Sequence, residues 1–539
     1  MKKHLPIILI LLLAAALRFI QLGKNPPGLY WDEVSLGYNA YSILKTGKDE
    51  HGEFLPLARF KAFGDYKPPG YIYATVPSIA LFGLNNFAVR FPSALAGVVM
   101  VWLTYLLVKE LKIENFKLKI AELAALILAI SPWHLQLSRV AFESMLAACF
   151  NLAAVYFFIK AIHKKPYHLI LSAVFFVLTL YTFNSNRLLT PLLLIVLSLI
   201  YFKGLWQIKR PVIIAALIGI ILSLPLIPYL RSPESKVRWH EVNIFSNLDL
   251  ILTANQRIAS DANSRIAKLL HHRYLGHATN FLSHYFDHFE GKYLFITGDG
   301  NRRFSTQSTG QLYLIEIPLL LFGFYFLLTS KSKTAAAVLL AWFFLGSIPS
   351  ATARETPHAL RSLSGLPSPQ IIIALGILQL IKVLKTRPQI TLAIVVGLYT
   401  FSFLKFQYIY YRYSPQEFAS EWLTQYPPLV NYLRSVESDY DKIYVTSEYN
   451  RPYIYFLFYS QFDPATFQAE STTTRTGDAF GFFDVHQVGK YIFDQPDWLN
   501  PQPNTLYVTG PGQPPPGYQL ITVISGTDHQ NYFSVANHQ

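Results

Sequence analysis

Two scarcities define this sequence: it has few charged residues and a single cysteine. Asp, Glu, Lys and Arg make up 14% of the 539 residues, whereas a soluble protein usually contains about 25% of them. Hydrophobic residues reach 52% and the mean hydropathy is +0.28. This balance excludes a soluble enzyme. The lone Cys149 excludes a disulfide framework and a site in which several thiolates hold a metal.

The charges that are present are mostly basic. Lys and Arg number 46 against 32 Asp and Glu, which gives a formal net charge of +14. Such an excess can indicate nucleic-acid binding, but here the bases lie in short blocks between apolar runs. That pattern is typical of membrane topology, so we expect membrane lipids and no nucleic acid as partners. The aromatic content of 15% fits either an interfacial belt or a sugar-binding surface.

Apolar runs of suitable length predict an α-helical polytopic membrane protein. A transmembrane helix needs roughly 17 to 25 mostly apolar residues, and about eleven segments of the chain meet this requirement. The predicted spans are residues 5–22, 87–108, 119–137, 142–162, 167–183, 188–203, 211–230, 312–329, 334–350, 367–384 and 389–405.

The basic blocks predict the orientation of these spans. With a cytoplasmic N-terminus every inner loop is basic, whereas the outer turns hold only isolated cations, so the positive-inside rule favours this orientation. The odd number of spans then makes the C-terminus extracytoplasmic. A cleaved signal peptide is the alternative for the first span, because alanines follow its basic start. The inner-loop cations are Lys2, Lys3, Lys109, Lys112, Lys117, Lys119, Lys164, Lys165, Lys203, Lys209, Arg210, Lys331, Lys333, Lys385 and Arg387.

Three polar regions are left on the predicted outer side. They are a first loop of residues 23–86, a long loop of residues 231–311, and a C-terminal tail. Strand-like stretches at 442–446, 505–509 and 519–524 predict that the tail is a small soluble α/β domain. The chain is thus expected to consist of a transmembrane domain, residues 1–405, and an extracytoplasmic α/β domain, residues 406–539. The chemistry should lie on this side, because the inner loops are too short to build a site.

Adjacent carboxylates follow the first predicted span. Asp32 and Glu33 come after Trp31 at the outer membrane surface. One interpretation is a catalytic base, and the other is a helix start with Asp32 as the N-cap and Glu33 in the first turn. Further along, Lys67 precedes two prolines that restrict its backbone.

A second ionisable pair lies near the mouth of the fourth predicted span. Arg139 and Glu143 have the i, i+4 spacing that places two residues on one helix face. A structural ion pair is the simple explanation. Ionisable residues at membrane depth are costly, however, and therefore suggest function.

The long loop contains several histidines. His284 and His288, together with Asp287, have the spacing of metal ligands on a helix. No third ligand is firmly placed, so we expect an interfacial amphipathic helix and no metal or other cofactor.

Taken in order, four motifs resemble those of a known family. They are Asp32-Glu33, residues 47–52 (Gly-Lys-Asp-Glu-His-Gly), Lys67-Pro68-Pro69 and Arg90-Phe91-Pro92-Ser93. They resemble the first outer loop and second span of GT-C membrane glycosyltransferases of the protein O-mannosyltransferase and aminoarabinose transferase type, glycosyltransferase family 39. The resemblance extends to about residue 405 and is most specific between residues 31 and 143.

The resemblance implies roles for individual residues. It implies that Asp32 is the base or orients the acceptor, that Glu33 completes the pair, and that Lys67 contacts the lipid phosphate. A second acidic site follows an arginine in the next outer turn, which matches Arg139 and Glu143, although the family more often has Asp at the latter position. Tyr66 stands where aminoarabinose transferases often have Glu, which weakens the transfer of that substrate, or of a metal, to this chain.

A further turn resembles the Pro-His-x-x-Arg turn of bacterial members. His358 and Arg361 lie between the ninth and tenth predicted spans with i, i+3 spacing. Together they would face a lipid-linked phosphate. Binding of ordinary lipid headgroups is the alternative.

These residue types suit sugar transfer from a polyprenyl phosphate. Phosphate is already a good leaving group, so the reaction needs a base and fixed cations rather than a carboxylic acid. We expect a membrane glycosyltransferase that moves a sugar, with inversion, to a lipid, glycan or protein acceptor on the extracytoplasmic side. Asp32, Glu33 and Glu143 are the predicted catalytic residues, and Lys67, Arg139, His358 and Arg361 the predicted phosphate ligands.

Other classes of function stay open at this point. A flippase or transporter of lipid-linked glycans would more often show broken spans and charges near the bilayer midplane, whereas the charges here gather at the outer ends. A polymerase or ligase of surface glycans, or a receptor that uses the tail, would also fit a polytopic protein of this composition.

The charge pattern generates a test of topology. A reporter fused after Gln539 should be extracytoplasmic, whereas reporters inserted between Lys109 and Lys119, or between Lys331 and Lys333, should be cytoplasmic. Accessibility of each reporter to a membrane-impermeant reagent checks this. A cytoplasmic C-terminal reporter would contradict the model with eleven spans.

Overall fold

The computed structural model of the chain divides into two compact units. One unit comprises Met1–Leu17, Ala96–Leu137 and Ser144–Phe406, and the other comprises Arg18–Leu95, Ser138–Glu143 and Gln407–Gln539. We call them the first and the second unit. The structure describes residues 4–63, 65–113, 120–384, 388–449, 451–469, 474–477, 483–498 and 500–538. Among the predicted inner-loop cations, Lys2, Lys3, Lys117, Lys119, Lys385 and Arg387 lie outside these residues.

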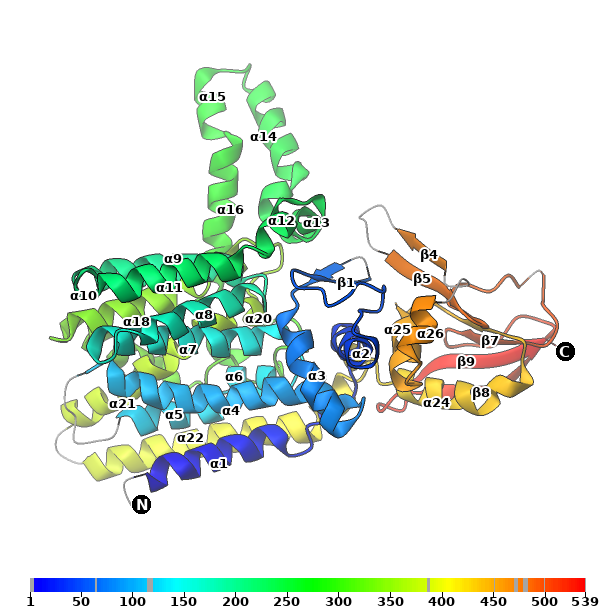
Figure 1. The fold of residues 1–539 in the computed structure, drawn as a ribbon, viewed down its shortest axis with the longest axis horizontal. Coiled ribbons are helices and arrows are strands. Elements are labelled where there is room, and N and C mark those ends of the chain that lie inside the picture. The colour runs from blue at the N-terminus through cyan, green and yellow to red at the C-terminus, as the bar shows by residue number, and fades with distance from the viewer. Residues whose placement is uncertain are drawn as a thin grey trace. The chain divides into compact units, whose positions relative to one another are not determined.

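Up to residue 412 the chain is almost entirely helical (Figure 1). In chain order the helices are α1 (Leu5–Phe19), α2 (Trp31–Thr46), α3 (Gly70–Phe82), α4 (Asn86–Glu110), α5 (Ile120–Ile130), α6 (Pro132–Ser138), α7 (Glu143–His163), α8 (His168–Leu180), α9 (Asn186–Ile200), α10 (Phe202–Gln207), α11 (Lys209–Ser223), α12 (Leu226–Arg231), α13 (Pro233–Val242), α14 (Leu248–Ser260), α15 (Arg265–Leu270), α16 (Arg273–Asp287), α17 (Glu316–Thr329), α18 (Lys333–Leu345), α19 (Ile348–Ala351), α20 (Ala359–Ser362), α21 (Ser368–Val383) and α22 (Pro388–Arg412).

Several of these helices suit a membrane. Among the described residues, four helical segments are long and apolar enough to cross one: α4, α7, Lys333–Ala351 and α22. Two further pairs qualify if each bent pair is one span: α5 with α6, bent by 58°, and Ala359–Gly365 with α21, bent by 61°. The helices α1, α3, α8, α9 and α17 are apolar but shorter.

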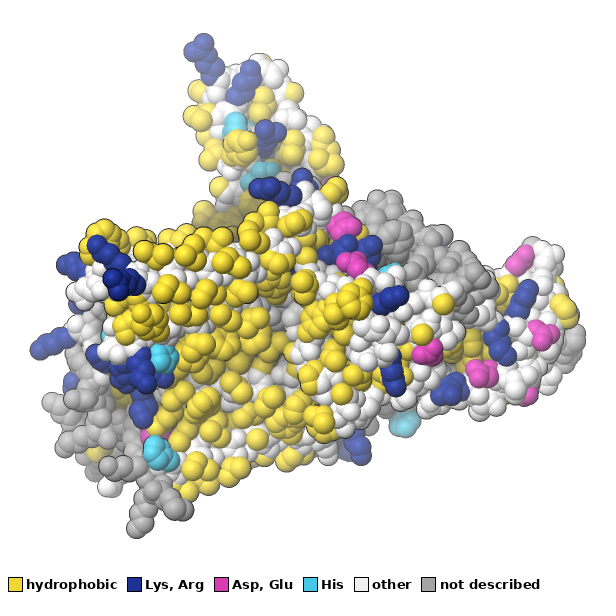
Figure 2. All heavy atoms as spheres, viewed as in Figure 1, with side chains coloured by type: hydrophobic (Ala, Val, Ile, Leu, Met, Phe, Trp, Pro, Cys, Tyr) yellow, Lys and Arg dark blue, Asp and Glu magenta, His cyan; other side chains and the backbone are white. Residues whose placement is uncertain are grey.

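Each predicted span overlaps a helix of the structure, and Figure 2 shows the apolar face that these helices present. The protein is therefore a helical, multi-pass membrane protein, as predicted. The number of eleven spans and their orientation stay predictions.

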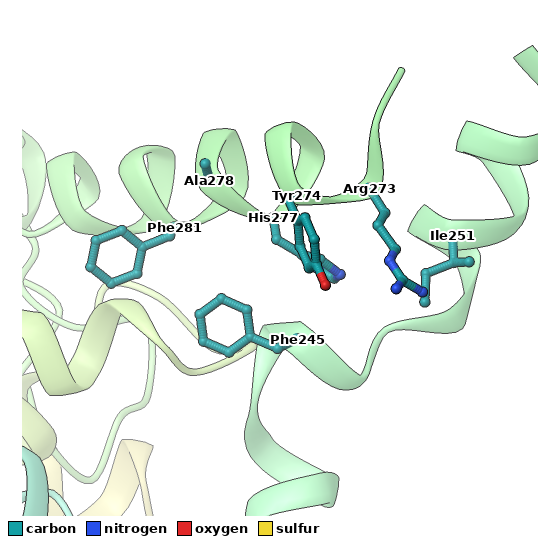
Figure 3. Close-up of a pocket in the computed structure, with 7 residues that line it drawn as sticks. All are labelled: Phe245, Ile251, Arg273, Tyr274, His277, Ala278 and Phe281. Atoms are coloured by element: carbon teal, nitrogen blue, oxygen red, sulfur yellow. The ribbon is translucent and has the colours of Figure 1, made fainter. Parts of the chain in front are cut away.

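The predicted long loop is largely helical. In Figure 1 the helices α14 and α16 stand out from the other helices of the first unit as an arm. The base of α16 is attached through His284, whose Nδ1 lies 2.8 Å from the Ala353 carbonyl oxygen, and through the Tyr285 hydroxyl, which donates to the Phe344 carbonyl at 3.0 Å. Further out, the arm encloses a pocket of about 580 Å³ (Figure 3). Its lining residues are Phe245, Ile251, Arg273, Tyr274, His277, Ala278 and Phe281.

The second unit contains two sheets. A hairpin pairs β1 (Phe60–Ala62) with β2 (Asp65–Lys67), antiparallel. The larger sheet has the strand order β4-β5-β6-β3-β7-β9-β8, and in it β3 runs parallel to β6 and to β7. Its strands are β3 (Lys442–Val445), β4 (Thr474–Gly477), β5 (Phe483–Val488), β6 (Tyr491–Ile492), β7 (Thr505–Thr509), β8 (Tyr518–Ser525) and β9 (Asn531–His538). Short helices accompany it: α23 (Ser414–Glu417), α24 (Tyr426–Val436), α25 (Pro452–Tyr459) and α26 (Pro464–Ala469).

The three stretches predicted as strands are β3, β7 and β8. What the sequence did not indicate is that the first loop packs with the tail in one unit. The Tyr455 hydroxyl donates to the Leu29 carbonyl at 3.0 Å, and the Tyr38 hydroxyl donates to the Phe462 carbonyl at 3.1 Å. At Gly37 a Cβ atom would lie 2.7 Å from the Phe458 ring, so α2 and α25 approach closely. The boundary predicted at residue 405 stays a prediction.

Small residues also set the closest helix contact of the first unit. A Cβ atom on Gly376 of α21 would lie 1.7 Å from the Leu319 carbonyl oxygen of α17, and one on Gly323 would lie 2.1 Å from the Ile372 oxygen. Glycine is therefore needed on both helices, because any side chain would force them apart.

This contact predicts the cost of a single methyl group. Gly376→Ala should lower the free energy of unfolding by about 1–3 kcal/mol, because the added atom overpacks the contact between α17 and α21. The matched control is Gly397→Ala in α22, where a Cβ atom meets nothing within 4 Å. Thermal unfolding in detergent compares the two variants. Equal unfolding temperatures would show that α17 and α21 can separate without loss.

Candidate active site

The first turn of α2 separates the two adjacent carboxylates. The helix begins at Trp31 with Tyr30 as its N-cap residue, and the Tyr30 N–H donates to Glu33 Oε2 at 3.1 Å. Glu33 therefore caps the helix from its third position, as in a capping box. The alternative in which Asp32 is the N-cap is wrong. The Asp32 side chain keeps 30% of its surface exposed, whereas that of Glu33 is fully buried.

The β1–β2 hairpin brings Lys67 to Asp32. Lys67 pairs with Phe60, and two residues earlier Asp65 pairs with Ala62, so both side chains lie on one face of β2. The Lys67 ammonium lies 2.6 Å from Asp32 Oδ1 and 3.7 Å from Asp65 Oδ2, with 7% of the side chain exposed. The structure thus joins the predicted base to the predicted phosphate ligand.

Three carboxylates set the charge of this ammonium. Burial alone would lower the pKa of Lys67, but Asp32, Asp65 and Glu143 outweigh it and raise the pKa above its ordinary value. Lys67 is therefore cationic at neutral pH. Glu143 itself is buried at the start of α7, so three of the predicted site residues, Asp32, Lys67 and Glu143, gather in one cluster.

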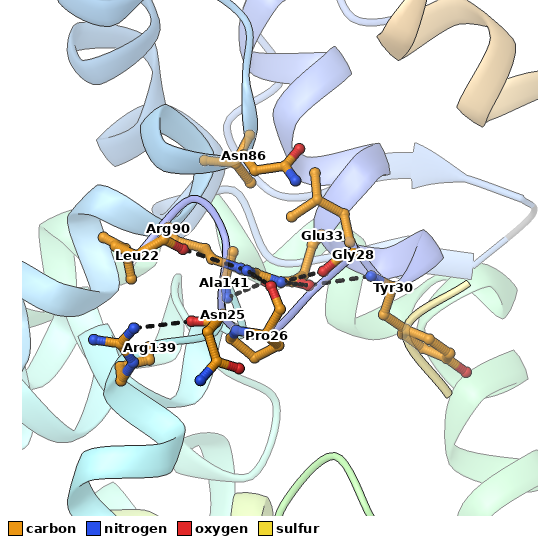
Figure 4. A network of polar contacts seen from close by, with 12 residues as sticks. Leu22, Asn25, Pro26, Gly28, Tyr30, Glu33, Asn86, Arg90, Arg139 and Ala141 are labelled. Atoms are coloured by element: carbon orange, nitrogen blue, oxygen red, sulfur yellow. Dashed lines mark hydrogen bonds and ion pairs between the residues drawn. The ribbon is translucent and has the colours of Figure 1, made fainter. Parts of the chain in front are cut away.

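Glu33 belongs to a separate buried network (Figure 4). Arg90 of α4 donates from Nε to Glu33 Oε1 at 2.9 Å and from Nη2 to Oε2 at 3.0 Å, and both side chains are fully buried. The Ala141 N–H donates to Glu33 Oε1 at 2.7 Å. Arg90 also donates to the carbonyls of Pro26, at 2.7 Å, and of Gly28. Glu33 and Arg90 thus act as a structural anchor, which holds the first turn of α2 to α4 and to the first loop. A catalytic role of Glu33 stays a prediction.

Arg139 lies in the same region of the second unit. Its guanidinium, 1% exposed, donates to the carbonyls of Arg18 at 3.1 Å, Ile20 at 2.9 Å and Asn25 at 2.9 Å (Figure 4). It lies over the Tyr410 ring, 5.6 Å from the centroid. In this structure backbone carbonyls at the end of α1 and at the start of the first loop accept hydrogen bonds from the guanidinium that we predicted to bind the donor phosphate. That role stays a prediction.

The predicted helix face shared by Arg139 and Glu143 is wrong. The helix α6 ends at Ser138 and α7 begins at Glu143, so no helix carries both residues. The physical reason is a pair of long-range hydrogen bonds: Arg139 donates to the Asn25 carbonyl and the Ala141 N–H donates to Glu33, and both hold the segment between α6 and α7 in a non-helical conformation.

The other two predicted phosphate ligands belong to the first unit. His358 precedes α20 and is buried, with Nδ1 4.0 Å from Asp299 Oδ2, and Arg361 is in α20. Asp299 accepts the Ala359 N–H at 2.6 Å and the Asn301 N–H at 2.8 Å. Burial raises the pKa of Asp299 to about 6, against the lowering effect of these N–H groups.

His288 supports the same turn of the first unit. Its Nδ1 lies 2.8 Å from the His284 carbonyl oxygen, and its Nε2 accepts the His358 N–H at 3.1 Å and lies 2.6 Å from Ser350 Oγ. Burial lowers its pKa to about 4, so the ring is neutral. Both ring nitrogens are thus engaged. In the part of the chain that the structure describes, no three His, Cys, Asp or Glu side chains converge as a metal site.

Sequence reasoning missed three acidic or basic partners: Asp65, Arg90 and Asp299. Asp65 had a signal, because i, i+2 residues of a strand share a face with each other. Arg90 had one too, because a charge within an apolar span needs a partner. Asp299 had none, since it lies in an irregular segment whose fold decides what it touches.

Known proteins are similar to this chain in sequence. Residues 8–229 match the family model described as dolichyl-phosphate-mannose-protein mannosyltransferase. "Putative mannosyltransferase YkcB" of Bacillus subtilis (strain 168) is 30% identical over 253 residues. That alignment covers 43% of this chain and 33% of the relative, so the match spans about a third of the curated relative's length.

Solved structures are similar in fold. ArnT from Cupriavidus metallidurans in the apo state has a TM-score of 0.54 at 13% identity, with 98% of this chain and 97% of that chain covered. The same protein bound to undecaprenyl phosphate has a TM-score of 0.53 at 12% identity, covering 98% and 97%. AglB from Archaeoglobus fulgidus, in complex with an inhibitory peptide and a dolichol-phosphate, has 0.50 at 12% identity, covering 85% and 64%. These likenesses show that the chain has the GT-C fold.

The anchor network generates a stability prediction. Glu33→Gln should lower the free energy of unfolding by roughly 3–5 kcal/mol, because it leaves the buried Arg90 guanidinium without a countercharge. The matched control is Glu53→Gln, which removes a partly exposed partner of Arg59 at 2.6 Å and should cost about 1 kcal/mol or less. Thermal unfolding of both variants is the measurement. Similar losses in the two would mean that Glu33 is no anchor.

Proposed function

We propose that this chain, whose residues 8–229 match the family model described as dolichyl-phosphate-mannose-protein mannosyltransferase, is a glycosyltransferase with a polyprenyl-phosphate-linked sugar as donor. The acceptor is a hydroxyl group on the extracytoplasmic side of the membrane. The observation that carries the proposal is the contact of 2.6 Å between Lys67 and Asp32 within a cluster of carboxylates. It combines a cation for the donor phosphate with a base for the acceptor.

The proposed reaction needs two groups from the protein, the Lys67 cation and the Asp32 base. The phosphate departs without protonation, so the negative charge that develops on it must be stabilised by a cation. Lys67, held charged by its neighbours, supplies that cation. The acceptor hydroxyl must lose a proton as it attacks, and Asp32 takes it. Attack from the side opposite the phosphate inverts the anomeric carbon.

The ion pair couples donor binding to the base. While Lys67 holds Asp32 at 2.6 Å, the ammonium stabilises the carboxylate and makes it a weak base. A donor phosphate that draws Lys67 toward itself relieves Asp32 of this partner. Asp32 then regains basicity only when the donor is in place, which limits proton abstraction to the productive complex.

The remaining residues have supporting roles in this proposal. Glu33 and Arg90 fix the first turn of α2, and hence the position of Asp32. Glu143 keeps Lys67 charged from the start of α7. The name of the Bacillus subtilis relative supports mannose as the donor sugar. Lipid, glycan and protein remain the three classes of acceptor.

Three variants separate the role of the base from that of the phosphate ligand. Asp32→Asn should reduce turnover by roughly 10²–10⁴, the usual contribution of a general base, and should leave donor binding intact. Lys67→Ala should instead weaken donor binding, and Lys67→Arg should restore it only in part, because a guanidinium has a different geometry from an ammonium. Labelled polyprenyl-phosphate mannose, with purified protein, serves both as the substrate for turnover and as the ligand for binding.

The control is Asp463→Asn, which changes an exposed carboxylate that caps α26 in the same unit. It should leave turnover and binding unchanged. Near-normal turnover in Asp32→Asn would move the base to Glu143, and Glu143→Gln then tests that assignment. If neither substitution affects turnover, the glycosyltransferase proposal fails in favour of a flippase.

A further inference from the structure

A second pocket lies at the ends of the helices of the first unit. It has a volume of about 700 Å³ and is lined by four segments that are far apart in the sequence. They are the end of α4, the end of α7, the turn between α9 and α10, and the turn between α17 and α18. No family role and no predicted site residue falls in this pocket.

The pocket is basic. Lys112, Lys203, Lys331 and Lys333 line it, together with His163. Of the described residues that line it, none is acidic. The neighbouring Glu110 carboxylate is paired with Lys164 at 2.7 Å. Four lysines from three segments therefore line one concavity, and their charge favours an anion with more than one charge or with several oxygens. The Lys333 ammonium also donates to the Leu328 carbonyl at 3.1 Å.

One wall of the pocket is apolar and open. Leu199 is 69% exposed and Phe202 is 58% exposed, and both line the pocket beside Ile162. These side chains continue the apolar surface of α9, and Figure 2 shows dark blue side chains gathered where the apolar face of the helices ends. A ligand that fills the pocket must combine an anionic group with hydrocarbon.

The walls are tied together without a ligand. The Ser332 hydroxyl donates to the Lys112 carbonyl at 3.5 Å, which joins the turn after α17 to the end of α4. His163 Nδ1 lies 3.0 Å from the Glu110 carbonyl oxygen, and its ring lies against that of Tyr201, with 6.1 Å between the centroids. These contacts join the segment of Lys112 to that of Lys331 and Lys333, and α7 to the turn that precedes Lys203.

We propose that this pocket binds an anionic phospholipid of the bilayer, with its phosphate among the four lysines and its acyl chains along α9 and α10. Charge complementarity selects the headgroup, because a zwitterionic lipid would place its own cation among the ammonium groups. The same lysines were interpreted from the sequence as orientation signals alone. With that orientation the lipid belongs to the cytoplasmic leaflet.

The test uses the full chain in nanodiscs of defined lipid. One preparation contains phosphatidylcholine alone and the other contains about 20% phosphatidylglycerol, and bound lipid stabilises the folded protein by mass action. The wild-type protein should unfold at a higher temperature in the second preparation, and native mass spectrometry should show phosphatidylglycerol retained in preference to phosphatidylcholine. The double substitution Lys203→Gln with Lys333→Gln should remove at least half of the shift and the preference.

The matched control is Lys165→Gln with Lys382→Gln, which removes the same charge from a predicted inner loop and from the end of α21, both outside the pocket. It should keep both the shift and the preference, as should Lys203→Arg with Lys333→Arg. An equal shift in the glutamine variant and the wild type would overturn the proposal. So would stabilisation by a soluble anion, tested with pyrophosphate in phosphatidylcholine nanodiscs, without any preference for phosphatidylglycerol. If the glutamine variant does not fold, lipid retention by the wild type alone decides.

Discussion

The candidate site depends on one buried ion pair, that between Glu33 and Arg90. A carboxylate and a guanidinium without solvent contact persist only when both are fully hydrogen-bonded, and here they use each other, the Tyr30 and Ala141 N–H groups and the carbonyls of the first loop. The pair therefore fixes four chain segments at one point. Asp32 owes its position to this, since it directly precedes Glu33 in the first turn of α2.

Beside this neutral pair lies a group whose charges do not balance. Asp32, Asp65 and Glu143 surround a single ammonium, Lys67. Glu33 and Arg90 make their hydrogen bonds within the protein, and they hold the surrounding segments in place. In the second group the Asp32 carboxylate is partly exposed to solvent, and the Lys67 ammonium has more than one carboxylate beside it. The Glu33–Arg90 pair holds the backbone next to Asp32 in place. A ligand can therefore draw the Lys67 ammonium away from Asp32 by moving the lysine side chain alone, without a change of the backbone.

Local patterns predicted most of the fold. Each apolar run that we predicted as a span overlaps a helix, and the strand-like stretches at 442–446, 505–509 and 519–524 coincide with β3, β7 and β8. The family resemblance selected Asp32 and Lys67 as separate site residues, and only the structure shows that they form an ion pair. The sequence could not predict the hydrogen-bond partners of Glu33 and Arg139, because these partners are distant in the chain. Glu33 contacts residues 57 and 108 positions away, and Arg139 contacts one 114 positions away. The periodicity of apolar residues in helices and strands indicates which residues share a face, and it does not indicate contacts between distant segments.

The hydrogen bond from Tyr455 to Leu29 spans 426 positions of the chain. At a synthesis rate of about 5–20 residues per second, the acceptor carbonyl waits roughly 20 to 85 s for its donor. During this time the first loop lacks the surface on which α2 comes to rest. A nascent chain that already contains Asp32 and Lys67 therefore still lacks part of the unit in which these two residues lie, and the candidate site is completed only when the tail has been made.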